Sequence, residues 1–351
     1  MTRLHTIALD AMGGDFGPGI IVPAAAAAMK RMGPTKFLFF GDEKQIKTEL
    51  SKFKHLSAVS DIIHTDLKIL GSDKPSAAIR KSKDTSMRLA IESVAEGRAD
   101  AVMSAGNTGA LMALSKMILK CLPGISRPAI ASAFPTLNGR TLMLDLGANL
   151  ECDAEVLTQF AVLGAVYARV VMGIENPAVG LLNVGTEDMK GHEEVRAAAA
   201  ILSEIKFPGT YHGFIEGNDI TKGTVDVVVT DGFTGNVALK TAEGVGKLTS
   251  QFLREAFKSS PLAIAGYFLA RGAIARMKDR VDPRFYNGGM FLGLSGICVK
   301  SHGGSDVVGT ENAIVVAVDL VRNGFNIRVA EEIQELVRQE SFLPKATAIA
   351  P

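Results

Sequence analysis

Glycines and carboxylates cluster near the start of the chain in a pattern suited to holding an anion. A short apolar run from Ile7 ends at Asp10, and residues 13–19 then supply four glycines and a proline. The alanine-rich stretch over residues 20–32 predicts a helix. The first turn of a helix offers unpaired N–H groups and a partial positive charge, which suit phosphate or another anion. For this loop alone, glycines that only avoid steric clash are an equally good explanation.

Similar loops follow four further predicted strands. Each loop carries small residues together with Asp, Asn, Thr or Ser, at residues 105–110, 147–149, 185–192 and 231–236. In an open parallel sheet the carboxyl ends of the strands meet at one edge, and ligands bind there. Any one loop could be a turn with a helix cap. Together they predict an oxyanion site, with phosphate as the ligand.

The residues expected to form this site come from all of these loops. Glycines admit a ligand close to the backbone, and hydroxyl and amide groups supply donors and acceptors. Asp10 and Asp145 are expected to orient neighbouring donors, because carboxylates repel a phosphate. The expected substrate-binding residues are Asp10, Gly13, Gly14, Ser104, Asn107, Thr108, Asn149, Thr234 and Gly235.

The loops sit between strands and helices that alternate along the chain. The strands are continuous apolar runs, typical of strands buried on both faces, so we predict a three-layer α/β/α architecture with a mostly parallel sheet. A single domain is expected over residues 1–340, with an apolar helical excursion at about 255–285 and a flexible tail at 341–351. Residues 56–63 read as either loop or strand. The other predicted strands are 35–41, 99–104, 140–146, 178–184, 225–230 and 297–300, and the other helices are 85–97, 108–122, 154–172, 192–205, 236–258, 312–323 and 329–340.

Composition excludes several classes of protein. The 38 Lys and Arg nearly balance the 37 Asp and Glu among 351 residues, so no overall positive field attracts nucleic acid. Cys121, Cys152 and Cys298 form no C-x-x-C pair and read as reduced thiols of a cytoplasmic protein. No secretion signal and no uninterrupted apolar stretch long enough to span a bilayer is evident. No metal-ligand cluster stands out, so neither a metal nor another cofactor is expected.

Five segments resemble the motifs of the bacterial phosphate acyltransferases of phospholipid synthesis (the PlsX family), in order and over about residues 7–340. The resemblance implies an isocitrate/isopropylmalate-dehydrogenase-like fold and a homodimer. It further implies transfer of a long-chain fatty acyl group from acyl carrier protein to inorganic phosphate, with the acyl-phosphate passed to a membrane glycerol-phosphate acyltransferase. The segments are Asp10-Ala-Met-Gly-Gly-Asp15, Ser104-Ala-Gly-Asn-Thr-Gly109, Asp145-Leu-Gly-Ala-Asn149, Asn183-Val-Gly-Thr-Glu187 and Asp231-Gly-Phe-Thr-Gly-Asn236.

The chemistry of that reaction selects candidate catalytic residues. Phosphate is itself the nucleophile, so no acyl-enzyme is needed and the absence of a Gly-x-Ser-x-Gly elbow fits. Cys152 is the nearest candidate nucleophile, but it reads better as a small residue filling a loop. Lys190 lies in a glycine-flanked loop and is either a ligand for phosphate or a solvated lysine. Asn236 is either an oxyanion donor or a helix cap. We predict Lys190 and Asn236 as catalytic, and the resemblance supports both.

His302 begins a Gly-Gly-Ser-Asp sequence that resembles the adenosine-binding loop of decarboxylating dehydrogenases. In one interpretation this loop holds the phosphopantetheine arm of the carrier, and His302 protonates the departing thiolate. In the other, His302 is only a hydrogen-bonded part of a structural loop. We keep His302 among the candidate catalytic residues.

The most apolar stretch of the chain, residues 261–270, is followed by a group of cations. It is too short to span a bilayer, but it suits shallow membrane contact or docking of an acidic acylated carrier protein. A dimer-interface helix is the alternative, and these interpretations can overlap. The residues expected at this contact are Leu262, Ile264, Phe268, Arg271, Arg276, Lys278 and Arg280.

Three other functions stay open on the sequence. An NAD-dependent decarboxylating dehydrogenase of the same fold would need an acidic metal site and an arginine-rich clamp, and neither is grouped at the strand ends. A short-chain phosphotransacetylase would use coenzyme A. A non-catalytic scaffold would bind carrier protein and leave its thioester intact.

Overall fold

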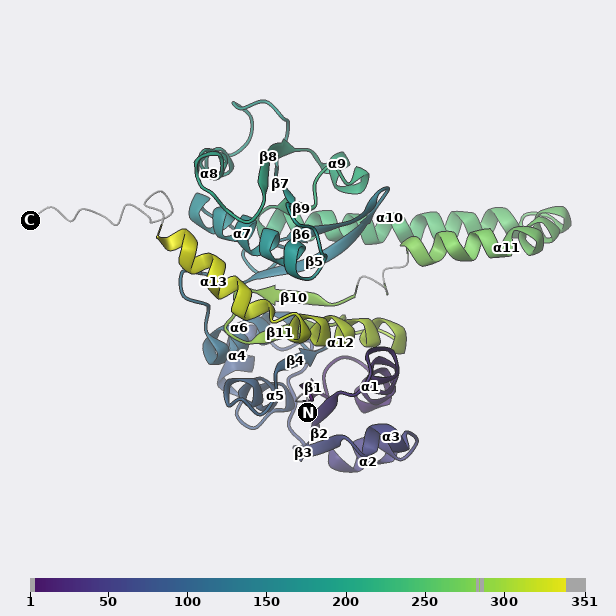
Figure 1. Cartoon of the computed structure of the whole chain (residues 1–351). Coiled ribbons are helices and arrows are strands. Elements are labelled where there is room, and N and C mark those ends of the chain that lie inside the picture. Colours follow the sequence, from purple (N-terminus) through teal and green to yellow (C-terminus); the bar gives the residue numbers. More distant parts are fainter. Residues whose placement is uncertain (1–3, 282–283, 285–286, 339–351) are drawn as a thin grey trace, which may run out of the picture.

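One sheet of 11 strands runs through the molecule from end to end (Figure 1). The computed structural model describes residues 4–281, 284 and 287–338. The strand order is β3-β2-β1-β4-β11-β10-β5-β6-β9-β7-β8. The strands are β1 (Thr6–Asp10), β2 (Lys36–Gly41), β3 (Ser60–His64), β4 (Ala101–Ser104), β5 (Ala129–Thr136), β6 (Gly139–Leu144), β7 (Ala178–Leu182), β8 (Thr210–Ile215), β9 (Val227–Val229), β10 (Gly289–Leu292) and β11 (Ile297–Lys300).

The sheet is mostly parallel, as predicted, but its two parallel halves run in opposite directions. Strands β3, β2, β1, β4 and β11 pair in parallel, and so do β6, β9, β7 and β8. Between them, β11 to β10, β10 to β5 and β5 to β6 are all antiparallel. Three successive reversals leave the second half antiparallel to the first. The expectation that all five loops share one edge is therefore wrong, because it did not include β5 and β10.

Helices cover both faces of the sheet and complete the predicted three layers. Phe37 and Phe39 of β2 belong to one buried cluster, whereas Leu38 and Phe40 belong to the other, so alternate residues of one strand are buried on opposite sides. One cluster includes α1, α2, α7, α8, α12 and α13, and the other α4, α5, α6 and α9 with α10 packed against it. The helices are α1 (Pro18–Met32), α2 (Glu43–Leu50), α3 (Lys54–Ser57), α4 (Pro75–Arg80), α5 (Ser86–Ala95), α6 (Thr108–Leu119), α7 (Ala154–Val170), α8 (Glu193–Glu204), α9 (Gly217–Lys222), α10 (Gly232–Lys258), α11 (Pro261–Val281), α12 (Val307–Arg322) and α13 (Phe325–Val337).

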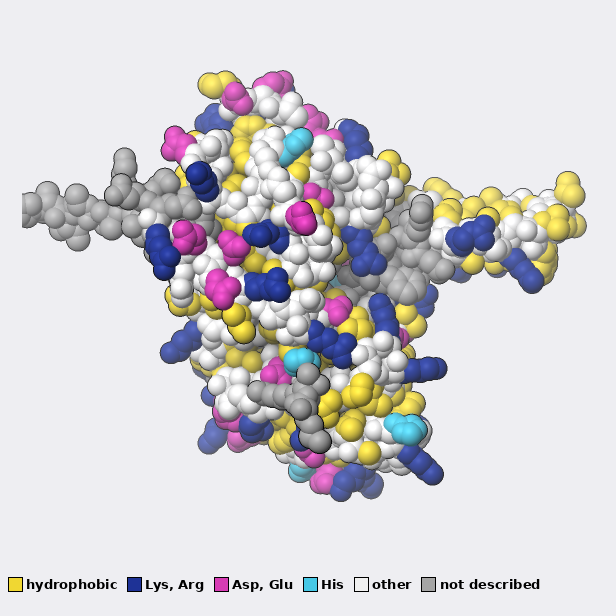
Figure 2. All heavy atoms as spheres, in the orientation of Figure 1, with side chains coloured by type: hydrophobic (Ala, Val, Ile, Leu, Met, Phe, Trp, Pro, Cys, Tyr) yellow, Lys and Arg dark blue, Asp and Glu magenta, His cyan; other side chains and the backbone are white. Residues whose placement is uncertain are grey.

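Helices α10 and α11 form a long hairpin that projects from the body of the molecule (Figure 1). The Phe257 ring of α10 meets the Tyr267 ring of α11 edge-on, with centroids 5.4 Å apart. Apolar side chains remain on the surface of this hairpin, and Figure 2 shows them along the projection and at its far end. Leu262 is 83% exposed and Leu269 is 91% exposed. Among the described residues, no helix is long and apolar enough to cross a membrane.

Some elements begin elsewhere than the sequence predicted. The long helix expected from residue 236 starts at Gly232, because Asp231 caps it by accepting a hydrogen bond from the Thr234 N–H at 2.8 Å. The last helix, predicted over 329–340, begins at Phe325 and is described to Val337, while residues 339–340 lie outside the described residues. Residues 56–63, whose sequence fits either loop or strand, contain the end of α3 and most of β3. The predicted tail at 341–351 lies outside the described residues.

Candidate active site

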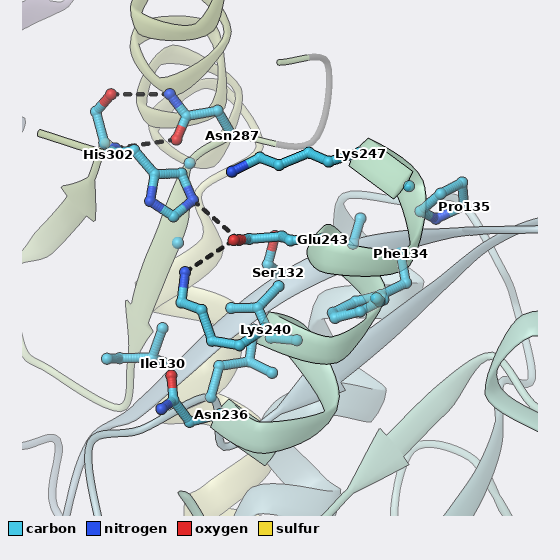
Figure 3. A pocket seen from close by; sticks show the side chains of 18 of the residues that line it. Ile130, Ser132, Phe134, Pro135, Asn236, Lys240, Glu243, Lys247, Asn287 and His302 are labelled. Atoms are coloured by element: carbon cyan, nitrogen blue, oxygen red, sulfur yellow. Dashed lines mark hydrogen bonds and ion pairs between the residues drawn. The ribbon is translucent and has the colours of Figure 1, made fainter. Parts of the chain in front are cut away.

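A cavity of about 620 Å³ lies between α10 and the central strands of the sheet. One wall includes Ile130, Ser132 and Phe134 of β5, and α10 forms another wall (Figure 3). The sheet reverses direction at β5 and β10. The cavity at this place is therefore lined by residues from both parallel halves of the sheet. Thr108 and Lys300 enter from the half that holds β4 and β11, and Leu146 and Asn236 from the half that holds β6 and β9.

Cations and apolar groups share the lining of this cavity. Lys240, Lys247 and Arg254 lie seven residues apart along α10, and a spacing of seven returns to nearly the same face of a helix. The apolar lining comes from Ile130, Phe134, Pro135, Leu146, Leu239 and Ala242. An anionic head group and an apolar chain therefore both find complementary surface.

His302 and Lys240 meet at one carboxylate. Glu243 Oε1 lies 3.5 Å from His302 Nε2, and Glu243 Oε2 accepts a hydrogen bond from Lys240 Nζ at 2.9 Å (Figure 3). The backbone N–H of His302 donates to Asn287 Oδ1 at 3.1 Å, so the loop is fixed as well. Desolvation lowers the pKa of His302; Glu243 opposes this shift, and nearby lysines add to it. The imidazole is therefore mostly neutral at neutral pH.

Lys300 is a cavity residue that the sequence analysis did not select. It is the last residue of β11, in register with Ser104 of β4 and Gly289 of β10. Its Nζ donates to the carbonyl oxygen of Ser301. Burial lowers the pKa of Lys300 to about 8, although Asp10 favours the charged form. The sequence did carry one signal, since residues 297–300 were predicted as a strand and Lys300 stands at its carboxyl end.

Asp10 is a buried support beneath the first two loops. Its Oδ1 accepts a hydrogen bond from Ser86 Oγ at 2.7 Å, and its Oδ2 accepts one from Ser104 Oγ at 2.6 Å. The Ser104 hydroxyl in turn accepts the Gly106 N–H at 3.0 Å. A Cβ at Gly13 would lie 2.7 Å from Asp10 Oδ2, so this glycine is required by close approach. Burial raises the pKa of Asp10. This geometry matches the orienting role expected of Asp10.

Asp145 holds the loop after β6 in the same way. Its carboxylate accepts hydrogen bonds from the backbone N–H groups of Ile130, Ala148 and Asn149 at 2.9, 3.1 and 2.7 Å. The Asn149 amide donates to Asp145 Oδ2 and to the Pro128 carbonyl, both at 2.9 Å. Gly235 packs on this loop, where a Cβ would collide with the Asp145 carbonyl oxygen. Asn149 and Gly235 thus build the loop and do not line the cavity.

Two further predicted residues make capping hydrogen bonds. The Asn107 side-chain oxygen accepts the Ala110 N–H at 2.9 Å and so caps α6, and its Nδ2 donates to the carbonyls of Gly71 and Asp73. Thr234 Oγ1 donates to Asp231 Oδ2 at 2.7 Å within the cap of α10. Gly14 has a φ of 77° and lies against the 302–304 loop, where the Asp15 N–H donates to Gly303. Contacts of Asn107, Thr234 and Gly14 to phosphate stay predictions.

Asn236 faces the cavity from the second turn of α10 (Figure 3). The cap of this helix is Asp231, so Asn236 is not needed to begin the helix. Gly147, which has a φ of 125°, lies directly beside the Asn236 side chain. In the part of the chain that the structure describes, the Asn236 amide makes no hydrogen bond, and its N–H groups are available to a ligand.

Lys190 and Cys152 lie outside this cavity. Lys190 Nζ pairs with Glu187 Oε1 at 2.7 Å, and its side chain is 51% exposed. This hydrogen bond raises the pKa of Lys190, so it is a cation at neutral pH. The loop bearing Lys190 follows β7, at the same edge of the sheet as the start of α10, which bears Asn236 and follows β9. Burial raises the pKa of Cys152 to about 12, which keeps it a thiol and a weak nucleophile. Across the described residues, no group of three His, Cys, Asp or Glu side chains is placed to hold a metal.

Comparison with known proteins gives the family. Residues 5–328 match the model of the family described as fatty acid synthesis protein. The phosphate acyltransferase of Rhodospirillum centenum is 56% identical over 351 residues, which cover 100% of this chain and 98% of that protein. This chain belongs to the phosphate acyltransferase family. The phosphate acyltransferase of Paramagnetospirillum magneticum is 54% identical over 96% of each chain. As a member of this family, the protein is an acyltransferase of fatty acid synthesis.

The fold of this acyltransferase also occurs in solved phosphotransacetylases. The EutD phosphotransacetylase of Staphylococcus aureus matches with a TM-score of 0.61 and 15% identity, over 91% of this chain and 94% of that chain. A phosphotransacetylase of Streptococcus pyogenes matches with a TM-score of 0.61 and 18% identity, over 92% and 95%. At this level of identity the likeness shows a shared fold.

Proposed function

We propose that the enzyme transfers a long-chain fatty acyl group from acyl carrier protein to inorganic phosphate, forming acyl-phosphate for phosphatidic acid and phospholipid synthesis. The observation that carries this proposal is a cavity with both cationic and apolar walls in a chain of this family. The acyl chain would lie against the apolar wall, and the phosphate against the cations. The proposal includes one catalytic domain over residues 1–340, an isocitrate/isopropylmalate-dehydrogenase-like fold, a homodimer and no cofactor.

The residues of the cavity would have two roles, to orient the phosphate and to stabilise the charge that develops on the thioester oxygen. A phosphate oxygen attacks the thioester carbonyl carbon, and negative charge develops on the carbonyl oxygen. The Asn236 amide N–H, which faces the cavity, would donate to that oxygen. Lys240 and Lys247 would hold the phosphate by charge. Lys190, at the same edge of the sheet, would join them on leaving Glu187. No acyl-enzyme is required, in keeping with the raised pKa of the partly buried Cys152 thiol.

The reaction is tested by counting both products. We expect palmitoyl-acyl carrier protein to release its thiol only when inorganic phosphate is present, with acyl-phosphate formed in equal amount. Thiol release is followed colorimetrically, and acyl-phosphate is trapped with hydroxylamine as the hydroxamate. Thiol release without phosphate would indicate a thioesterase and would contradict the proposal.

The same assay separates the alternatives. The shared fold makes a coenzyme A-dependent phosphotransacetylase the second candidate, and that enzyme would prefer acetyl-coenzyme A to palmitoyl-acyl carrier protein. A scaffold would bind the carrier protein and leave its thioester intact. A decarboxylating dehydrogenase would reduce NAD with a 2-hydroxy acid and a divalent metal.

We further propose that the exposed apolar hairpin contacts the membrane surface, where a membrane glycerol-phosphate acyltransferase receives the product, while the enzyme itself is cytoplasmic. Leu262, Ile264 and Phe268 leave apolar area on the surface of α11, and Arg271 and Arg276 follow on the same helix. An apolar surface beside cations suits shallow binding to an anionic bilayer. The side chains of Lys278 and Arg280 lie outside the described part of the chain. A second copy of the chain would cover the part of the hairpin nearer the sheet.

Replacing Leu262 with glutamate should weaken binding to phosphatidylglycerol vesicles by about ten-fold, because one buried leucine contributes about 1.5–3 kcal/mol. The measurement is co-sedimentation with vesicles. Leu137→Glu is the matched control, since Leu137 is 82% exposed on another surface, in the turn between β5 and β6. Equal vesicle binding by both variants would contradict membrane contact through the hairpin.

A further inference from the structure

We propose that Lys300 is the general acid of the acyl transfer, giving a proton from Nζ to the departing sulfur; this inference rests on the proposed function. The thiolate of the carrier must gain a proton as the C–S bond breaks. One of the two interpretations of the sequence assigned this step to His302. The structure places Lys300 in the same cavity, two residues before His302.

The position of Lys300 is fixed by the centre of the sheet. Cys298 faces the buried cluster on the α10 side, and Ile297 and Val299 face the other, so alternation directs Lys300 toward α10 and the cavity. Its neighbours in register are Ser104 and Gly289. Two flanking strands therefore hold the backbone that carries the ammonium group.

The ammonium group of Lys300 has no carboxylate partner within ion-pair distance among the described residues. Its hydrogen bond is to the neutral carbonyl of Ser301. A largely buried cation without a counter-charge is costly, and such groups occur where a ligand or a reaction uses them. Asp10 is near enough to favour the charged form, but its carboxylate is occupied by Ser86 and Ser104.

The pKa of Lys300 matches that of a thiol leaving group better than the pKa of His302 does. Burial lowers the pKa of Lys300 to about 8, close to the value of about 8.5 for a free thiol. A matched acid is protonated before the reaction and still able to give its proton. His302, with a pKa below its usual value, is mostly deprotonated at neutral pH. The charged or titratable groups near Lys300 are Asp10, Asp15, Lys240, Cys298 and, in the same cavity, Glu243 and His302.

The step balances without a further reactant. An oxygen of hydrogen phosphate bonds to the carbonyl carbon, and the C–S bond electrons pass to sulfur. The sulfur takes a proton from the Lys300 ammonium, which becomes an amine. That amine then takes the proton carried by the attacking phosphate. The products are the acyl-phosphate dianion, the carrier thiol and Lys300 in its starting state.

Lys300→Met and Lys300→Arg should each lower kcat on palmitoyl-acyl carrier protein by about 100-fold or more, because both lack a transferable proton at neutral pH. Arginine keeps the charge, so an anion-holding role would leave Lys300→Arg active and raise only the KM for phosphate in Lys300→Met. Either of those results would overturn the proposal. Lys44→Met, at an exposed position of α2, is the control for loss of a lysine. Melting curves check that each variant folds.

The pH profile tests the proton itself. The wild-type kcat should fall as pH rises through about 8, because the acid is active only while Lys300 is protonated. Lys300→Arg should lack this falling limb, since arginine stays protonated. A second arm replaces the carrier by thiols, comparing palmitoyl thioesters of N-acetylcysteamine and 4-nitrothiophenol. The aryl thiolate leaves without a proton, so Lys300→Met should lose much less on that substrate.

The possible outcomes separate the two levels of inference. An identical falling limb in wild type and Lys300→Arg overturns the role of Lys300, whether or not the small thioesters are substrates. An equal loss on both small thioesters also overturns it. A wild-type enzyme that releases no thiol in response to phosphate overturns the proposed function, and the role of Lys300 with it.

Discussion

Replacing Asn236 with alanine should slow phosphate-dependent acyl transfer by about 100-fold or more, while the protein still folds. Removal of one donor to a developing oxyanion typically costs two to three orders of magnitude in rate. Asn236 faces the cavity and has no hydrogen-bond partner in the described part of the chain, so alanine removes only a contact made to substrate. Helix α10 keeps its cap at Asp231. The measurement is kcat for thiol release from palmitoyl-acyl carrier protein.

Three further variants sharpen this result. Asn236→Asp should be at least as slow as Asn236→Ala, because a carboxylate repels both phosphate and oxyanion. Thr241→Ala, on the same helix but away from the cavity, is the control and should retain the wild-type rate. Lys190→Ala should also reduce turnover strongly. If Lys190→Ala keeps a near-full rate while Asn236→Ala does not, Lys190 is not catalytic. Its role is then limited to the surface ion pair with Glu187.

The sequence predicted most strands of the two parallel halves, apart from the edge strands β3 and β8, because those strands carry their own signal. The apolar runs that became β4, β7 and β9 are buried on both faces, and each leads to a loop rich in small polar residues. Such a pattern is local, so a single sequence suffices to find it. The expected orienting role of the two carboxylates was also found. Asp10 accepts hydrogen bonds from the Ser86 and Ser104 hydroxyls. Asp145 accepts them from backbone N–H groups, including that of Asn149 in its own loop.

The reversal at the centre of the sheet was not predictable in the same way. Strand β5 is made largely of small residues and contains Pro135, and β10 is short and begins with a glycine. Neither has the β-branched run that marks a strand. The direction in which two strands pair is set by contacts distant in sequence, here between β10 and β5 across nearly half of the chain. Without those strands, loops from opposite edges were expected at one edge.

Lys300 was missed for a related reason. A lysine after an apolar strand ordinarily lies in solvent, and its place at the end of the predicted strand 297–300 does not by itself distinguish this one. It becomes a half-buried cavity residue because β10 and β4 flank it and α10 covers that face. In the same way, Asn149 and Thr234 looked like ligands for phosphate, yet each has its polar groups engaged within its own loop.

Replacing Gly246 with leucine should change which acyl chains the enzyme accepts. Gly246 lies in the middle of α10 and lines the cavity, and a Cβ placed there meets no atom within 4 Å. The Cβ of a leucine would therefore meet no clash, and its side chain would extend into the space proposed for the acyl chain. Excluding about three or four methylenes, at about 0.8 kcal/mol each, should lower kcat/KM for palmitoyl-acyl carrier protein by about 100-fold. Octanoyl-acyl carrier protein should be affected much less.

Gly244→Leu is the control that tests whether the effect of Gly246→Leu comes from filling the cavity. Gly244 lies on the same helix, also has open space around it, and does not line the cavity. Because glycine weakens a helix interior by about 1 kcal/mol relative to alanine, neither replacement should destabilise α10. Gly244→Leu should thus leave the preference for palmitoyl over octanoyl chains unchanged. If Gly246→Leu instead slows both chain lengths equally, the acyl chain does not reach this part of the cavity, and the cationic face of α10 serves the carrier arm there. A loss confined to the long chain would place the fatty acid between α10 and β5, with Phe134 and Leu239 as its apolar neighbours.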